Sequence, residues 1–550
     1  MKNYKYILYA VLLSLGTLMF VSCLDDLDRT PNDDLNKTAD QVYDDKLASY
    51  EMGVAKIYAG LAISGNAGGD GDSDVAGVDG GSQASFLRGL WNVQELPTDE
   101  AHCVWNDKGI PDFNNITWTP DNVFLKGMYY RLFYQVGLSN EFLRETTDGK
   151  LSSRGMNDAT KAEVNVLRAD ARFMRALAYY YLLDLFRNVP FVTEESSIGI
   201  KAEQIQGNDL FAYIEAELKA IETELLDPFV GYHNQYYGRV TKAAAWTLLS
   251  RLYLNAEVYT GTAKYKESAQ YAEKVMGAGY ELEPVFANMF NVDNDKSKEM
   301  IFPIRYMGPD TQTWGGMTFL IASTVPSALQ DAVNSVGAWQ GNRARKDVLT
   351  TFEKQTNFAL DARKATVRTD KTTQNEITDV TSYENNGIPI VKFYNRKKDG
   401  SLPPGGTNIV FVDFPLFRLA EVYLTYAEAV VRDPSAGDQA KALQLVNKVR
   451  ERAYSDKSKA PITASQLTTD FILDEKGREF LFEAQRRTDL IRHGKFTGDK
   501  YVWEWKGGAK AGKAVEDHFK IYPIPTDDLA TNGNLKQNPG YGSGAVAEKN

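Results

Sequence analysis

Cysteine, histidine and positive charge are all scarce in this chain of 550 residues. It has two cysteines, four histidines and a formal net charge of −11 at pH 7. Two cysteines cannot build a disulfide framework. The histidines share no metal-ligand spacing; they are His102, His233, His493 and His518. An acidic chain without a compensating basic patch is repelled by nucleic acid phosphates, so we expect no nucleic acid partner.

Long apolar runs are also lacking, except at the N-terminus. There a basic leader precedes an apolar run at residues 7–21, which is short for a membrane span and typical of a secretory signal peptide. The run ends at Phe20-Val21-Ser22-Cys23, which resembles a bacterial lipobox with Phe20 in place of the usual leucine. We expect removal of residues 1–22, acylation of Cys23 and a tether over 23–40. Cleavage by an ordinary signal peptidase is the alternative.

An acidic stretch follows the expected acylation site. Residues 24–28 read Leu-Asp-Asp-Leu-Asp, which resembles the signal that sends lipoproteins of Bacteroidetes-type bacteria to the outer face of the outer membrane. Acyl chains rather than a helix would then hold the protein to its membrane. We therefore expect an outer-membrane protein that faces the cell exterior.

The rest of the chain is rich in the sequence patterns of amphipathic helices. Thr160 and Glu163 have the spacing of a capping box, apolar residues then recur at steps of three and four, and Pro190 marks the end. Similar patterns predict helices at about 122–145, 208–226, 242–259, 264–276, 416–432, 439–454 and 471–493.

These helices are arranged in pairs that resemble tetratricopeptide repeats. The pairs occupy about 122–277 and 415–493, and loop-rich insertions occupy about 64–121 and 280–406, with strand-like pieces at 300–304 and 388–393. We predict a mainly α-helical fold, a single domain over 41–550, in which a helix-pair scaffold carries long insertions that hold the ligand site.

Catalytic motifs are absent or incomplete. Residues 507–513 spell G-x-x-x-x-G-K, but Ala514 stands where a P-loop requires Ser or Thr. Asp99 and Glu100 lie near Trp105 and leave a secreted glycoside hydrolase open as an alternative. Hydrolysis needs two carboxylates on opposite sides of the bond. Adjacent residues do not easily take those places, although a distant third acid could serve as the second carboxylate. We therefore expect no enzyme.

An oxygen-rich loop at residues 293–295 is a candidate calcium site. Asp293 and Asp295, together with Asp379, have the carboxylates that calcium prefers. A solvated turn is the alternative, and we expect no other cofactor.

Five segments in a fixed order resemble the SusD/RagB family of surface glycan-binding lipoproteins. They are Leu-Arg-Ala-Asp-Ala-Arg-Phe-Met-Arg-Ala-Leu at 167–177 continuing to Asn188-Val189-Pro190, then 238–244, 415–424, 475–490 and the tail at 522–541. The resemblance spans nearly the whole chain, from Cys23 to Tyr541. Within the family, residues 95–100 followed by Trp105, and 501–508, are most similar to the starch-binding founder.

The resemblance implies a glycan site. Trp105, Trp314 and Trp339 match the founder's arc of three aromatic rings, although ordinary core packing is the alternative for all three. Arg88 matches a polar contact. Asp107 or Lys108 stands where the founder has asparagine, which leaves the exact sugar open.

The implied function is non-catalytic binding of starch or other α-glucan oligosaccharides. The resemblance further implies delivery of the glycan to a SusC-like, TonB-dependent outer-membrane barrel. A receptor of the same fold for another polysaccharide or a peptide is the alternative.

Overall fold

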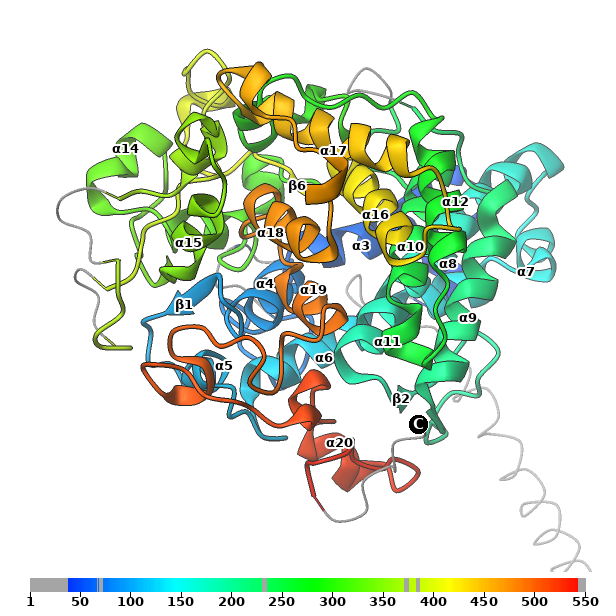
Figure 1. Ribbon diagram of the computed structural model, residues 1–550. Coiled ribbons are helices and arrows are strands. Elements are labelled where there is room, and N and C mark those ends of the chain that lie inside the picture. The colour runs from blue at the N-terminus through cyan, green and yellow to red at the C-terminus, as the bar shows by residue number, and fades with distance from the viewer. Residues whose placement is uncertain are drawn as a thin grey trace, which may run out of the picture.

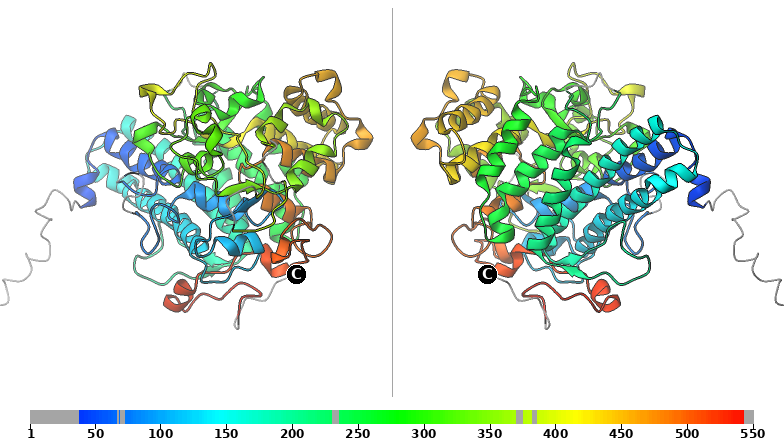
Figure 2. Two further views of the ribbon diagram at one scale, coloured as in Figure 1. Left: turned by 90° about the vertical axis from the view of Figure 1, so that its left-hand side faces the viewer. Right: turned by 90° about the vertical axis from the view of Figure 1, so that its right-hand side faces the viewer.

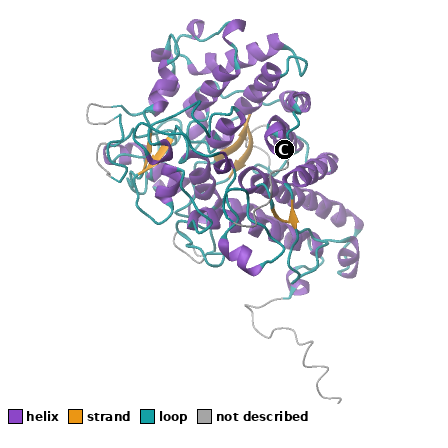
Figure 3. Ribbon diagram, turned by 60° about the horizontal axis from the view of Figure 1, so that its bottom comes forward, coloured by secondary structure: helices purple, strands orange, loops and turns teal. Residues whose placement is uncertain are grey.

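Helices dominate the computed structural model, which describes residues 38–66, 68, 73–229, 235–369, 375–381 and 386–542. Strands are short and form pairs (Figure 3). The predicted mainly helical fold is confirmed. The predicted signal peptide and Cys23 lie outside the described residues. In the part of the chain that the structure describes, no helix is long and apolar enough to cross a bilayer.

Long helices form one side of the molecule (Figure 2, right). Contacts run from α6 through α8 to α9, and from α10 through α12 and α16 to α17. Their bounds are α6 Val123–Glu145, α8 Asp158–Phe186, α9 Gly207–Ala220, α10 Lys242–Leu254, α12 Tyr265–Met276, α16 Leu419–Arg432 and α17 Gln439–Ala453. The two predicted hairpins, α10 with α12 and α16 with α17, are confirmed as packed pairs.

The central helix α8 begins earlier than predicted. Its N-cap is Asn157, whose side-chain oxygen accepts a bond of 3.0 Å from the backbone N–H of Thr160. Thr160 is thus inside the first turn and does not form the predicted capping box with Glu163. The helix ends at Phe186 because Arg187 takes a left-handed φ of 62° and the chain turns into a short strand.

Two other predicted helices differ from the structure at their ends or in their middle. Helix α9 begins at Gly207 without a side-chain cap, and it is followed by a 3₁₀ turn at Ile221–Thr223, so it is shorter at its C-terminal end than the predicted 208–226. The predicted helix 242–259 is two helices, α10 and α11 (Ala256–Thr260), separated at Asn255.

The start of α16 moves because its first residues join a sheet. Strand β6 (Phe414–Arg418) pairs antiparallel with β4 (Met300–Ile304), so the helix predicted from residue 416 begins at Leu419. The strand predicted at 300–304 is confirmed. The piece at 388–393 forms only isolated bridges, through Ile388 and Ile390.

The last long helix is broken. Residues predicted as one helix over 471–493 form α18 (Thr469–Glu479) and α19 (Arg486–Arg492). Between them, Phe482 and Ala484 both have left-handed φ angles, of 63° and 61°. A helix cannot pass through two such residues, and the break is occupied by the buried charges described below.

Short elements fill the two insertions, which lie opposite α7 and α12 in Figure 1. The remaining helices are α2 Ala39–Val42, α3 Leu47–Ala62, α4 Phe86–Glu95, α5 Ile110–Asn115, α7 Asp148–Ser153, α13 Met317–Ala322, α14 Gln330–Val333, α15 Asp347–Glu353 and α20 Thr526–Thr531. The other strand pairs are β1 (Ala101–Cys103) with β5 (Asn342–Ala344) and β2 (Val189–Pro190) with β3 (Gln204–Ile205). The pair β1–β5 joins the two insertions.

A buried network of arginines and glutamates lies where β6, α17 and α18 meet. Arg418 contacts Glu299 at 2.8 Å, Glu479 at 2.6 Å and Glu483 at 2.7 Å. Arg363 contacts Glu475 at 2.8 Å and Glu479 at 2.9 Å. All of these side chains are at most 1% exposed.

Glu479 is the centre of this network. Burial alone would raise the pKa of this carboxyl, but Arg452, Arg418 and Arg363 outweigh burial and lower the pKa to about 2. Glu479 is therefore an anion wherever the protein is folded near neutral pH, and three guanidinium groups depend on it.

We predict that Glu479→Gln lowers the free energy of unfolding by about 3–5 kcal/mol, because it leaves buried guanidinium groups without their shared counter-charge. Urea unfolding followed by circular dichroism measures the loss. The control is Glu281→Gln, which breaks an exposed pair with Lys298 and is expected to change stability by less than about 1 kcal/mol. Equal losses in the two variants would contradict the central role of Glu479.

Candidate functional site

Three tryptophans from separate loops come together on the insertion side. Trp105 follows β1, Trp314 precedes α13, and Trp339 precedes β5. The ring centroids of Trp105 and Trp339 are 6.5 Å apart with planes at 50°, and those of Trp314 and Trp339 are 6.2 Å apart with planes at 73°. Trp339 thus lies between the other two, and successive rings are turned relative to each other. We call these three residues the tryptophan arc.

The rings of the arc are half-buried, unlike the three tryptophans of the core. Trp91, Trp118 and Trp503 are at most 2% exposed and belong to the core. Each ring of the arc keeps part of its surface open to solvent, and flat apolar surface of this kind can stack on the C–H face of a sugar.

Phe319 of α13 forms the floor beneath Trp105. Its ring centroid lies 6.3 Å from that of Trp105 and 5.6 Å from that of the buried Trp91. Phe319 therefore connects the arc to the core, and the rings rest on packed side chains.

Arg88 of α4 contacts the arc from one side. Its guanidinium carbon lies 5.4 Å from the ring centroid of Trp105 and 4.8 Å from that of Phe319. Arg88 is 7% exposed, its Nε has no hydrogen-bond partner among the described residues, and Nη1 reaches only the Gly81 carbonyl at 3.5 Å. Burial lowers the pKa of this guanidinium. A buried donor without a partner among the described residues thus lies beside the arc.

Asp107 and Lys108 are exposed and follow Trp105 after Asn106. The carbonyl of Asp107 accepts a bond of 3.0 Å from the Ile110 N–H, which closes the turn into α5. Neither side chain is buried by this turn. The structure thus brings Arg88 of α4 together with the three tryptophans. Asp107 and Lys108 lie on the loop that carries Trp105, and the role of all six residues in binding stays a prediction.

Comparison with known proteins shows the family to which this chain belongs. A model of the SusD family matches residues 250–541, and a second, described as starch-binding and associating with the outer membrane, matches residues 93–254. The starch-binding protein SusD of Bacteroides thetaiotaomicron is 35% identical over 98% of this chain and 99% of its own length. The chain belongs to the SusD family.

Solved structures show the same fold in other SusD-family proteins. A SusD superfamily protein from Parabacteroides distasonis has a TM-score of 0.68 at 20% identity, covering 90% of this chain and 99% of its own. Surface glycan-binding protein A from Bacteroides thetaiotaomicron, solved in complex with laminarihexaose, has a TM-score of 0.64 at 20% identity, covering 89% and 99%.

The carboxylates beside the arc are not arranged for hydrolysis in this SusD-family protein. Asp99 is 2% exposed; its two oxygens accept bonds of 2.8 and 2.7 Å from Arg486, and Tyr501 donates a third, of 2.7 Å. Glu100 is 4% exposed, and burial together with Glu95 raises its pKa well above the usual range. Both side chains face the interior, where they cannot flank a glycosidic bond.

The three carboxylates predicted as calcium ligands do not lie close together. Among the residues that the structure describes, no three His, Cys, Asp or Glu side chains lie close enough to hold a metal ion. Asp293 pairs with Lys296 at 2.5 Å and accepts from the Lys398 N–H at 2.8 Å, and Asp379 accepts from Thr381 in an exposed turn. Asp293, Asp295 and Asp379 therefore do not form one cluster of carboxylates, and calcium binding stays a prediction.

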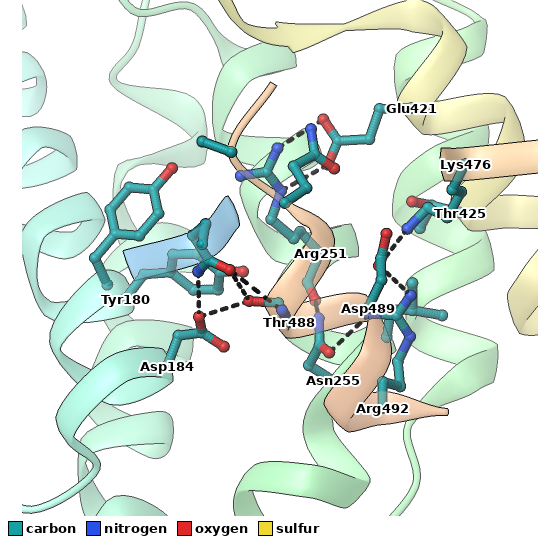
Figure 4. A pocket seen from close by; sticks show the side chains of 15 residues that line it. Tyr180, Asp184, Arg251, Asn255, Glu421, Thr425, Lys476, Thr488, Asp489 and Arg492 are labelled. Atoms are coloured by element: carbon teal, nitrogen blue, oxygen red, sulfur yellow. Dashed lines mark hydrogen bonds and ion pairs between the residues drawn. The ribbon is translucent and has the colours of Figure 1, made fainter. Parts of the chain in front are cut away.

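A buried polar pocket between α8, α10, α16 and α19 is structural (Figure 4). Its cavity measures about 20 Å³, which is room for about one water molecule. Its charged groups are paired: Arg251 with Glu421 at 2.6 Å, and Asp489 with both Lys476 at 2.7 Å and Arg492 at 2.5 Å. A sugar has neither space nor free partners here.

Phe319 was missed by sequence reasoning. It lies in an apolar stretch, Met317–Ala322, whose only sequence signal is that of a short buried helix. A pair of glycines, Gly315 and Gly316, follows Trp314. Its physical role is to bring that loop against α4, where the Gly315 carbonyl accepts bonds of 2.9 Å from the Arg88 N–H and 3.0 Å from Ser85 Oγ.

We predict that the buried acids at 95 and 100 make stability fall as pH rises. Burial raises the pKa of Glu95 from 4.5 to about 7. Between these values the unfolded chain releases a proton that the folded protein retains, so stability present below about pH 4.5 is lost as pH rises to about 7. Glu95→Gln should flatten this part of the curve of melting temperature against pH. Glu281→Gln should keep the wild-type slope, and identical slopes in all three proteins would refute the assignment.

Proposed function

We propose that this SusD-family protein is a non-catalytic receptor that binds starch-type α-glucans at the tryptophan arc on the cell surface. The tilted arrangement of the three rings carries the proposal, because successive rings at 50° and 73° fit a curved α-glucan better than a flat β-glucan chain. The name of the starch-binding relative supports the same ligand class.

The expected affinity is low. Each stacked ring buries roughly 50 Å² of apolar surface, which is worth about 1 kcal/mol at about 25 cal/mol/Å². Three stacks and a few hydrogen bonds, including those that Arg88 can donate, reach about 4–5 kcal/mol, or a Kd near the millimolar range. Many such contacts along one polymer add avidity, which suits a receptor that gathers polysaccharide.

In the full proposal, acyl chains on Cys23 hold the receptor to the outer face of the outer membrane, and a SusC-like, TonB-dependent barrel takes up the glycan. Family membership and the description of the second family model support both points. Affinity purification from detergent-solubilised membranes tests the partnership: recovery of the barrel only when the bait is present supports it, and recovery of the bait alone speaks against it.

We predict that Trp105→Ala, Trp314→Ala and Trp339→Ala each weaken binding of maltoheptaose about fivefold, since each removes one stack of about 1 kcal/mol. Calorimetric titration of the mature chain from Leu24 measures the change. Trp246→Ala is the matched control, because Trp246 is equally half-buried but lies on α10, bonded to Glu222.

Two outcomes of that titration would revise the proposal. Unchanged affinity in Trp339→Ala would remove the arc as the site. Binding of laminarin, xyloglucan or an inulin-type fructan in place of the α-glucans would keep the site and change its ligand.

We also predict no hydrolysis. Incubation with soluble starch should release reducing ends at the rate of the protein-free blank, because Asp99 and Glu100 are buried. Release above the blank that Glu100→Gln abolishes would restore the glycosidase alternative.

A further inference from the structure

The segment that carries Trp339 is fixed by its backbone. We call residues 337–342 the Trp339 loop. The Trp339 N–H donates to the Ala322 carbonyl at 2.7 Å, the Asn342 N–H to the Ser323 carbonyl at 2.8 Å, and the Val104 N–H to the Gly341 carbonyl at 2.8 Å. The loop is thereby held both to the end of α13 and to the residue that precedes Trp105, so its backbone has little freedom to retreat.

The indole of Trp105 lies directly on Gly341. A Cβ placed on Gly341 would be 2.0 Å from Cε2, 2.4 Å from Cζ2 and 2.5 Å from Cδ2 of Trp105. Carbon atoms in contact are normally about 3.5–4.0 Å apart. Any side chain at 341 would therefore occupy the place of the ring, and the ring is rigid, so it would have to move as a whole.

Backbone conformation does not explain this glycine. Gly341 is not among the residues with positive φ, whereas the preceding residue, Gln340, has a left-handed φ of 54° without being glycine. The strained position of the loop is thus occupied by glutamine, and the unstrained one by glycine. What requires a missing side chain at 341 is the contact with Trp105.

We propose that Gly341 is a positioning residue of the glycan site, because its missing side chain lets Trp105 lie against the Trp339 loop and so sets the angle between Trp105 and Trp339. This inference rests on the proposed function for its effect on binding. Its effect on the ring of Trp105 is independent of any ligand.

The first test is Gly341→Ala in the mature chain. Circular dichroism of the indole bands reports the Trp105–Trp339 pair without ligand, and titration with maltoheptaose reports binding. We expect altered indole bands and a Kd about fivefold higher, the loss of one stacked ring. The control is Gly137→Ala on α6, where an added Cβ meets nothing within 4 Å, and it should match the wild type in both measurements.

A double-mutant cycle separates positioning from damage to the fold. In a Trp105→Ala background the new Cβ has room, so Gly341→Ala should fold as Trp105→Ala does and add no further loss of affinity. A loss that persists in that background overturns the proposal, as do unchanged indole bands in Gly341→Ala. If the wild type binds none of the glycans, the proposed function fails. The role of Gly341 is then still decided by the indole bands, which Gly341→Ala should change in the wild-type background and leave unchanged in the Trp105→Ala background.

Discussion

The requirement that buried charges find partners governs how this molecule is assembled. Arg363 comes from the second insertion, Arg418 from β6, and Glu479 from α18, yet all three lie together where none is more than 1% exposed. Removing one member costs more than the pairs contribute net, since each ion was desolvated to reach its place. Any docking of the insertion against the helices that separated these residues would leave buried charges without partners.

Buried charges also have partners next to the loop that carries Trp105. Arg486, the first residue of α19, donates hydrogen bonds to both carboxylate oxygens of Asp99. Arg345 donates to the Ala101 carbonyl at 2.8 Å. These contacts fix the start of β1, and Trp105 follows two residues after that strand. Carboxylates that resemble a catalytic pair in sequence instead connect the first insertion to the C-terminal helices. Their chemistry serves placement of the arc.

Sequence periodicity predicted the helix pairs well, because amphipathic spacing and caps are local. It failed where contacts with residues distant in the sequence determine the secondary structure. Residues 416–418 have helical spacing but pair with β4, and 480–485 continue an apolar pattern but are broken so that Glu483 can reach Arg418. For the site, family resemblance identified the three tryptophans and Arg88. Nothing in their spacing showed that Trp339 would lie between the other two, and Phe319 and Gly341 act through contacts that no local pattern encodes.

Weak stacking makes rigidity a condition of binding at this arc. Each ring offers only about 1 kcal/mol, whereas ordering one mobile side chain on binding costs about 0.5–1.5 kcal/mol. Rings on mobile loops would therefore lose most of what stacking provides. The backbone bonds of the Trp339 loop to α13, the docking of Gly315 on α4 and the Phe319 floor are all made without ligand. In the proposed function, a shallow site of three rings can hold a sugar because its ordering is completed during folding, where burial of the apolar core supplies the free energy.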